Sequence, residues 1–562
     1  MPADATTFDA IVIGSGISGG WAAKELCERG LKTLVLERGR DVRHIKDYPT
    51  ANLAPWQLPH RGAMPRALAR DNPLISRAAG YGEDTAHFFV RDADHPYVQE
   101  RPFDWVRGYQ VGGKSLIWGR ACQRWSPYEF TAPERHGYGM NWPITYDDVA
   151  PWYSHVEQFI GVCGNRDGLA AMPDGEFLPP FEFTCAERHL RDVVRAKFGR
   201  HVVQGRWAHL SRPNAVHYQQ GRGTCQSRNL CMRGCPYGAY FSSNASTLPW
   251  AARTGNLTVR PDSVVHSVVY DERRGRASGV RVVDAHTGAV HEFRARVIFV
   301  NASALNSVLV LLNSTSRRFP HGLGNDSGLL GRYVCHHNYR AAADGTLDAF
   351  ADEYYYVRNP TECILVNFRN VGRQETDFVG GYTTFTGGYR ERGAHAEARV
   401  GGAYKDARAR PGPWHLYMYM QGETVPRYEN HVRLHESQKD RWGIPLLVTS
   451  VGYDENSARM IRDWRAEAQA MLEAAGCRDV TTRDNGQAPG LDIHEMGGCR
   501  MGRDPKTSLL NAHNQLHAVP NVFVTDGACM TSTGNQSPSI LYMALTARAV
   551  DHAARELARQ NL

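Results

Sequence analysis

The residues best suited to chemistry lie near the C-terminus, in the stretch His494-Glu-Met-Gly-Gly-Cys-Arg-Met-Gly502. An imidazole titrates near neutral pH, so His494 can act as a general base. Asn535 follows just before a Ser537-Pro538 start of an apolar helix, whose N-terminal dipole favours negative charge. This pattern predicts a base and an amide beside a helix N-terminus, as a flavin site would use to take a hydride from an alcohol carbon.

The N-terminal part carries the spacing of a dinucleotide-binding turn. An apolar run, Asp9 to Gly14, is typical of a buried parallel strand and leads into Gly14-Ser-Gly16-Ile-Ser-Gly19 and a helix that ends at Gly30. The glycines allow a tight turn and close backbone approach to a pyrophosphate. A second run, Thr33 to Glu37, ends in an acid that can bind ribose hydroxyls. The alternative is an ordinary glycine-rich turn. The predicted cofactor residues are Gly14, Gly16, Ser18, Gly19, Glu37 and Arg38.

This unit does not distinguish NAD from FAD. A second glycine cluster, Arg107 to Gly119, could lie along the pyrophosphate and ring of FAD, or it could be a buried hairpin turn. Asp526 ends another apolar strand pattern and can bond a ribitol hydroxyl or the backbone on the phosphate side. We favour FAD, and the further predicted cofactor residues are Gly112, Gly113, Ser115, Val264, Asp526 and Ser537.

Three of the twelve cysteines share one loop. Cys225, Cys231 and Cys235 have C-x5-C-x3-C spacing and are followed by Pro, an ending that recurs among iron-sulfur ligands. Three ligands without an evident fourth suit a three-iron cluster. Zinc would need another ligand, and a disulfide plus a free thiol is the remaining alternative. Distant candidates for a fourth zinc ligand are His201, His209 and His217.

Composition indicates a globular protein, with 42% hydrophobic and 22% charged residues among 562. The net charge of +7 is spread without a long Lys/Arg run, so nucleic acid is not an expected partner. The most apolar stretch, Val297 to Asn313, contains polar residues and predicts a buried strand and helix, with no transmembrane segment. The first residues lack the pattern of a signal peptide, so no export signal is expected.

The length predicts at least two domains. We assign 1–60, 100–140, 215–345 and 485–562 to a discontinuous nucleotide-binding domain, and 141–214 and 346–484 to a substrate domain. Residues 61–99 have little periodicity and are expected to form a surface excursion or lid. A helix capped by Thr145 or Asp147 is expected to pack the second domain. Within that domain we expect strands near 413–420, 431–435 and 445–451 and a helix over 455–475.

Over nearly its full length the sequence resembles the glucose-methanol-choline (GMC) flavin oxidoreductases. The resemblance implies an α/β chain, α+β overall, with a Rossmann-like FAD-binding domain and a discontinuous substrate domain on an antiparallel sheet. The C-x5-C-x3-C-Pro loop looks like that of bacterial sugar dehydrogenases whose flavin subunit carries a [3Fe-4S] cluster. The opening through Glu37-Arg-Gly-Arg-Asp looks like glucoside 3-dehydrogenases. The matching segments are Gly14 to Glu37, Gly112 to Ser115, Trp142 to Tyr146, Val297 to Ser307, His494 to Gly502, Asn521 to Asp526 and Asn535.

The resemblance implies roles for individual residues. His494 corresponds to the family's catalytic base and Asn535 to its hydrogen-bonding partner. Gly498 stands where many members have Thr, with little expected consequence. Members with covalent flavin carry a His where this chain has Ser115-Leu-Ile117-Trp, so FAD is expected to be held non-covalently. For substrate hydroxyls, the sequence offers only the His336-His337-Asn338 turn as a nominee.

The resembled sugar dehydrogenases work with a small helper subunit that carries the export signal, and with cytochrome c. The resemblance therefore implies oxidation of a secondary hydroxyl, at C3 of glucose or glucosides, by a periplasmic enzyme exported with its partner. A cytoplasmic location fits the sequence equally. The competing interpretations are a GMC oxidase that reduces oxygen to peroxide, and a flavin- or cluster-binding subunit without a substrate of its own.

Overall fold

The computed structural model describes residues 6–353, 355, 360–392 and 400–562. Residues 1–5, where the absence of a signal peptide was predicted, lie outside the described residues, as do short parts of the predicted substrate domain. Within the described ranges, every helix is too short or too polar to serve as a transmembrane span.

The first sheet has the parallel centre of a dinucleotide-binding fold. Its strands follow the order β18-β19-β10-β1-β2-β7, and β8 and β9 extend it through antiparallel pairing of β9 with β10. The four contacts from β19 to β7 are parallel. The strands are β1 Thr7–Ile13, β2 Thr33–Leu36, β7 Leu257–Arg260, β8 Ser263–Asp271, β9 Arg276–Asp284, β10 Val290–Val300, β18 Gln515–Leu516 and β19 Val519–Val524.

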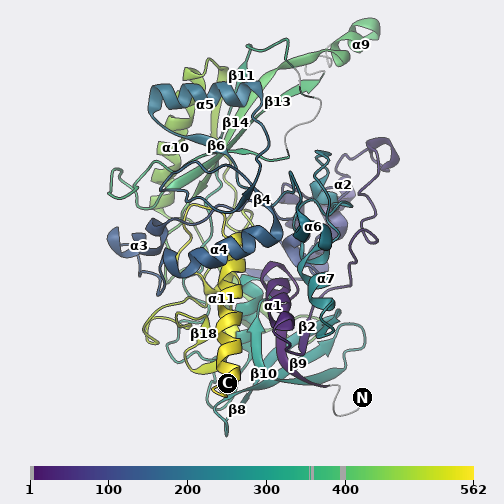
Figure 1. The fold of residues 1–562 in the computed structure, drawn as a ribbon, viewed down its shortest axis with the longest axis vertical. Coiled ribbons are helices and arrows are strands. Elements are labelled where there is room, and N and C mark those ends of the chain that lie inside the picture. The colour runs from purple at the N-terminus through teal and green to yellow at the C-terminus, as the bar shows by residue number, and fades with distance from the viewer. Residues whose placement is uncertain (1–5, 354, 356–359, 393–399) are drawn as a thin grey trace.

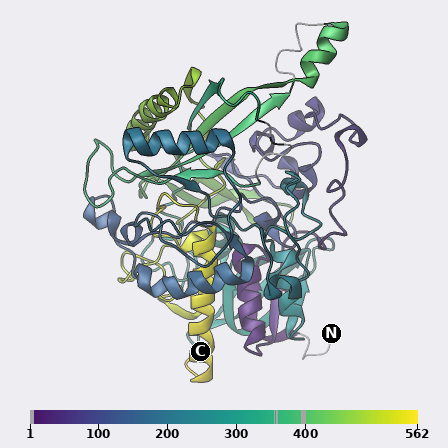
Figure 2. The same cartoon turned by 45° about the horizontal axis from the view of Figure 1, so that its top comes forward.

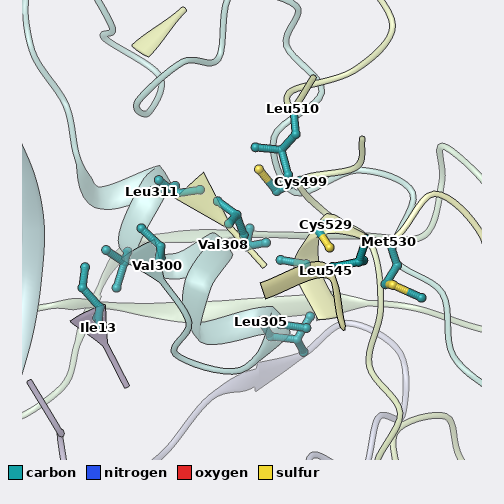
Figure 3. Packing of buried hydrophobic residues seen from close by; sticks show 14 of the residues in the cluster. Ile13, Val300, Leu305, Val308, Leu311, Cys499, Leu510, Cys529, Met530 and Leu545 are labelled. Atoms are coloured by element: carbon teal, nitrogen blue, oxygen red, sulfur yellow. The ribbon is translucent and has the colours of Figure 1, made fainter. Parts of the chain in front are cut away.

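Helices α1 (Ile17–Glu28) and α11 (Ser539–Ala558) lie side by side against this sheet, and α7 (Thr247–Ala252) contacts α1 (Figure 1). The predicted strands before Gly14 and Glu37, and the predicted helix that ends at Gly30, are confirmed. Helix α8 (Ala304–Asn313) confirms the second half of the apolar stretch from Val297. Its Leu305, Val308 and Leu311 pack with residues of β10 and of the segment after His494, including Cys499 (Figure 3).

The second sheet is antiparallel throughout, in the order β17-β11-β14-β13-β12-β6. Its strands are β6 Val202–Gln204, β11 Ala341–Leu347, β12 Cys363–Leu365, β13 Tyr382–Arg392, β14 Pro411–Gly422 and β17 Arg478–Asp484. Helices α5 (Cys185–Phe198) and α10 (Glu455–Ala474) cover one face. The β13–β14 pair reaches beyond the rest of the molecule and carries α9 (Gly401–Ala409) at its end (Figures 1 and 2). The chain is therefore α/β with an added antiparallel domain, as predicted.

Two expected placements differ from the structure. Helix α4 (Tyr146–Ile160) is capped by Thr145 as predicted, but it packs on α11, and its apolar face joins the core that contains Ile11 and Ile13 of β1. Strands β15 (His431–Lys439) and β16 (Pro445–Ser450) do not join the second sheet. They form a separate small sheet in which β15 pairs with β16 and β16 pairs with β3 (Val98–Gln99), and β15 contacts α8. Apolar periodicity predicts that these faces are buried but does not say against which sheet.

The predicted excursion, residues 61–99, contains only short elements: α2 Arg66–Asp71, η3 Ile75–Arg77, η4 Ala86–Phe88, η5 Asp92–Asp94 and β3 Val98–Gln99. The short η2 Pro55–Gln57 precedes it. Ile75 and Phe88 of the excursion form a small core with Tyr48 of the preceding segment, and Met232 of the cysteine loop packs against this core. The other short elements are α3 Pro127–Arg135, β4 Val162–Cys163, β5 Phe177–Leu178, α6 Ala215–Gln219, η6 Gly113–Leu116, η7 Cys231–Arg233, η8 Ser243–Ala245 and η9 Gly527–Cys529.

Candidate functional site

One cavity of about 990 Å³ lies between the two sheets and collects most of the predicted site residues. Gly19 and Gly112 are not among its lining residues, and neither are Asn535, Cys225 and Cys235. The predicted residues that line it are Gly14, Gly16, Ser18, Glu37, Arg38, Gly113, Ser115, Val264, His494, Asp526, Ser537 and Cys231.

The turn after β1 is shaped by close backbone contacts. Gly14 has φ +96, and a Cβ there would lie 2.3 Å from the carbonyl oxygen of Asn301. A Cβ at Gly19 would lie 2.0 Å from the carbonyl oxygen of Gly14, so the third glycine lets α1 approach the turn. At Gly16 a Cβ would meet no protein atom within 4 Å, although this residue lines the cavity. The open space beside Gly16 and the N-terminus of α1 is where a pyrophosphate binds in such folds.

Ser15 joins the acid after β2 to the second glycine cluster. Its backbone N–H and hydroxyl donate to Glu37 Oε2 at 3.1 and 2.5 Å, and its Oγ accepts the N–H of Gly112 at 2.9 Å. Gly39 N–H donates to Glu37 Oε1 at 3.0 Å. Gly112 therefore supports the turn from behind, whereas Gly113 and Ser115 line the cavity. The cluster is part of the nucleotide cleft, and η6 begins at Gly113 instead of a hairpin.

Asp526 lies at the carboxyl end of β19, one residue beyond Thr525. Its Oδ2 accepts from Ser307 Oγ at 2.5 Å, and its Oδ1 accepts from the N–H of Ala528 at 3.0 Å. Burial raises the pKa of Asp526 to about 6. The carboxylate thus has defined partners on the protein side while it faces the cavity.

His494 lines the cavity and contacts a second histidine. Its Nδ1 lies 2.8 Å from His337 Nδ1, and the two rings meet edge to face with centroids 5.0 Å apart. Burial, with His337 and Lys114 nearby, lowers the pKa of His494 well below its usual value. The ring is therefore neutral at physiological pH and can accept a proton. His337, which the sequence offered only as part of a nominated substrate turn, contacts the predicted base directly.

Asn535, the predicted partner of His494, does not line the cavity and is held by other buried side chains. Its Nδ2 donates to Glu129 at 3.1 Å and to Glu423 at 3.4 Å, and its Oδ1 accepts from Thr383 at 2.7 Å. Burial and the neighbouring Glu129 raise the pKa of Glu423 to about 7. These contacts hold the amide among buried side chains, so its role as a substrate partner stays a prediction.

The second sheet supplies the rest of the cavity wall, and sequence reasoning missed these residues. Along β14, Met418 and Met420 are buried with the helices, whereas Tyr417, Tyr419 and Gln421 alternate onto the opposite face. This Tyr-Met-Tyr-Met-Gln alternation is a sequence signal that could have located the site face. The cavity residues from this side include Tyr339, Ala342, Glu362, Phe385, Tyr419 and Asp492.

A carboxylate is fixed at this wall. Tyr417 and Tyr419 each donate their hydroxyl to Glu362, both at 2.7 Å. The ring of Tyr419 stacks on Phe385 with centroids 5.1 Å apart, and Tyr339 lies between Tyr419 and His494, at 6.0 and 5.9 Å from their rings. The cavity wall beside His494 therefore consists of aromatic rings and the carboxylate of Glu362, which is fixed by two tyrosine hydroxyls. No local pattern in the sequence identifies Glu362.

The cysteine loop is held by the excursion and by the segment just before it. Arg233 pairs with Asp84 and donates to the carbonyl of Leu53 at 2.9 Å, and Arg228 donates to the carbonyl of Ala51. All twelve cysteines are within the described residues and all are free thiols, so the disulfide alternative is wrong.

Of the three clustered cysteines, Cys231 lines the cavity. Burial raises the pKa of Cys225 to about 11, and the nearby Cys231 and Cys235 thiols act in the same direction. The described residues contain no group of three His, Cys, Asp or Glu side chains arranged to hold a metal ion. The loop thus brings three thiols near one another without forming a ligand set.

Comparisons with known proteins agree with this geometry. Residues 210–338 match the N-terminal domain of GMC oxidoreductases, and residues 426–546 match the C-terminal domain. The chain thus contains both the N-terminal and the C-terminal domain of the GMC oxidoreductases.

Two curated relatives align over almost the whole chain. The 2-methyl-1,2-propanediol dehydrogenase of Mycolicibacterium austroafricanum is 28% identical, with 99% of this chain and 96% of the relative covered. The fructose dehydrogenase large subunit of Gluconobacter japonicus is 25% identical, with 99% of each covered. The crystal structure of pyridoxine 4-oxidase from Mesorbium loti has the same fold, with a TM-score of 0.60 and 16% identity over 97% of this chain and 99% of that one. This GMC protein is a flavin oxidoreductase that acts on hydroxyl groups.

The residues present fit FAD, the cofactor of the family. Gly16 and the N-terminus of α1 leave open space for the pyrophosphate, Glu37 faces the same cavity, and Arg38 lies over the rings of Tyr109 and Trp442, at 4.8 Å from each. Bound FAD supplies the hydride acceptor. The chain supplies a neutral imidazole, His494, in the same cavity.

Gly16→Ala tests this cradle. A methyl group at position 16 meets no protein atom within 4 Å, so the apoprotein should fold normally. It would occupy space that the pyrophosphate needs, and we expect FAD binding to weaken by at least about tenfold. Flavin absorbance per protein after gel filtration measures the loss. Gly402→Ala, in α9 and equally free of contacts, is the control. Full flavin content in Gly16→Ala would contradict the assignment.

Proposed function

We propose that this GMC protein is an FAD-dependent sugar dehydrogenase. It oxidises a secondary hydroxyl, C3 of glucose or a glucoside, by hydride transfer to flavin N5. The observation that carries the proposal is one cavity that joins the nucleotide turn, the neutral His494 and the aromatic, carboxylate-bearing face of the second sheet. The choice of C3 rests on the resemblance of the N-terminal segment to glucoside 3-dehydrogenases.

The wall opposite the nucleotide turn suits a polyhydroxyl substrate. Glu362 presents a carboxylate whose position is fixed by two tyrosine hydroxyls, and carboxylates accept strong hydrogen bonds from sugar hydroxyls. Phe385 and Tyr419 offer flat apolar surfaces beside it. The fructose dehydrogenase large subunit, one of the aligned relatives, is named for a sugar substrate. A small apolar alcohol would use none of these polar groups.

The protein's part in the reaction is to hold the alcohol and take its proton. His494, neutral because of burial, accepts the hydroxyl proton as the carbon gives up its hydride. The N-terminus of α11 begins beside Ser537 and Ser539, which both line the cavity, and its dipole stabilises negative charge there. Asn535 is proposed as the partner of the alcohol oxygen, which requires its side chain to turn from Glu129 and Glu423.

Electron transfer to an external acceptor is the second part of the proposal. We propose that Cys225, Cys231 and Cys235 hold a [3Fe-4S] cluster and that cytochrome c accepts the electrons. Support comes from the C-x5-C-x3-C-Pro spacing, the free state of the thiols and the position of Cys231 at the cavity. The thiols would have to converge further than they do here.

A helper subunit and export to the periplasm complete the proposal, with a cytoplasmic enzyme as the alternative. The aligned fructose dehydrogenase is named as a large subunit, which supports a partner chain.

Anaerobic titration with sugars tests the reaction. We expect glucose or glucosides to bleach the flavin of the purified holoenzyme, and the product to be the 3-keto sugar. His494→Ala should retain FAD and lose at least about 100-fold in the rate of bleaching, because the base is gone. Rapid reoxidation by air with formation of peroxide would favour the oxidase instead. No bleaching by any alcohol would favour a subunit without a substrate.

Glu362→Gln tests the sugar face. The change removes a charge while keeping the shape, and hydrogen bonds to a charged group are worth roughly 1.5–3 kcal/mol. We expect the dissociation constant of the sugar to rise about 10- to 100-fold, with little change in the limiting rate of flavin reduction. Glu375→Gln, at the exposed Arg373–Glu375 pair, is the matched control. Equal affinities in the two variants would exclude Glu362 from sugar binding.

Iron and sulfide analysis tests the cluster. We expect iron and acid-labile sulfide in a ratio of about 3 to 4, with loss of both in Cys231→Ser. Because the predicted contacts to FAD are made by other residues of the cavity, sugars should still bleach the flavin of this variant, while cytochrome c reduction should fall. Cys477→Ser, buried in the second domain, is the control. Anaerobically purified protein without iron would refute the cluster and leave the sugar reaction unaffected.

A further inference from the structure

His337 has a hydrogen-bond environment that fixes the position of its own proton. Its Nε2 lies 2.9 Å from the carbonyl oxygen of Gly534 and 3.2 Å from that of Thr533. Both are acceptors, so a bare nitrogen there would face two lone-pair-bearing oxygens without a proton between them. Nε2 of His337 must therefore carry a proton.

The ring carries only that proton. Burial lowers the pKa of His337 to about 4, and the side chain is fully enclosed. The neutral ring then has a bare Nδ1, which can only accept a hydrogen bond. The atom 2.8 Å from it is Nδ1 of His494, so the proton between the two rings belongs to His494.

From these contacts we infer that His337 is a positioning residue that fixes the tautomer of His494. With Nδ1 of His494 protonated and donated to His337, Nε2 of His494 keeps a free lone pair on the ring that lines the cavity. This is the tautomer that a general base needs. The inference rests on the proposed function, in which His494 takes the proton of the alcohol.

The arrangement also accommodates the proton after transfer. When His494 Nε2 accepts the proton, both of its nitrogens carry hydrogen and the Nδ1–H still donates to His337. The rings need not turn, and no group near His337 has to change its protonation state. The backbone N–H of His337 donates to Asp492 Oδ2 at 2.8 Å, which fixes the main chain at the same point. The two histidines are 157 residues apart in the sequence, so no local pattern predicts that they form a pair.

Three substitutions separate a tautomer-setting role from simple packing. His337→Asn places an amide oxygen near the former Nδ1 and can still accept from His494. His337→Gln places its amide near the former Nε2 and keeps only the contact with the carbonyls. His337→Leu keeps neither. We expect the limiting rate of sugar-dependent flavin reduction to fall at least about 100-fold in the Gln and Leu variants, and by no more than about tenfold in the Asn variant. FAD content and sugar affinity should be unchanged in all three.

Equal rates in the three variants, whether all fast or all slow, would overturn the inference, because the acceptor would then make no difference. A variant that fails to fold is replaced by a direct measurement on the unaltered holoenzyme. Neutron diffraction from deuterium-exchanged crystals should show deuterium on Nδ1 of His494 and on Nε2 of His337. Deuterium on Nε2 of His494, with a bare Nδ1, would overturn the inference.

The neutron result does not depend on turnover. If no alcohol bleaches the flavin but the predicted deuterium positions are found, the proposed function fails and the assignment of the two protons stands. If sugars bleach the flavin and the deuterium positions are reversed, the sugar reaction stands and the role of His337 fails.

Discussion

The parallel pairing of β1, β2, β10 and β19 is the constraint on which the site depends. Since parallel strands end at the same edge of a sheet, the residues that follow them are brought together whatever their distance in the sequence. Gly14 follows β1, Glu37 follows β2, Asn301 follows β10 and Asp526 lies just beyond β19. Backbone contact between Gly14 and Asn301, and hydrogen bonds from Ser15 to Glu37, connect three of these ends directly.

The second sheet contributes by a different rule. Antiparallel strands have a period of two, so β14 sends its methionines toward α5 and α10 and its tyrosines toward the cavity. The same strand thus stabilises one core and forms one wall of the site. The wall carrying Glu362 and the nucleotide edge of the first sheet line the same cavity, in which we propose that the reaction takes place.

Burial and polar contacts set the protonation states of the titratable groups in this cavity and behind it. Burial keeps His494 neutral and raises the pKa of Asp526, Asp492 and Glu423 toward neutrality. His494, Asp526 and Glu423 have hydrogen-bond partners in His337, Ser307 and Asn535, respectively. Removal from water thus sets the protonation states, and specific contacts set the orientations.

The sequence by itself determined the elements and the nucleotide turn, because both depend on local patterns. The apolar run before Gly14, the glycine spacing and the acid at residue 37 are encoded within about forty residues, and together, in this order, they predict a dinucleotide-binding turn. The segment around His494 was likewise identifiable from its composition and its family resemblance.

Only the tertiary structure decided which distant side chains meet. The contact of His337 with His494, the enclosure of Asn535 by two glutamates and the hold of Tyr417 and Tyr419 on Glu362 all join different elements. The packing of α4 on α11, and of β15 on α8, was decided in the same way. Periodicity specifies that a face is buried, but the partner of that face is selected by complementary packing across the whole chain, which no local pattern contains.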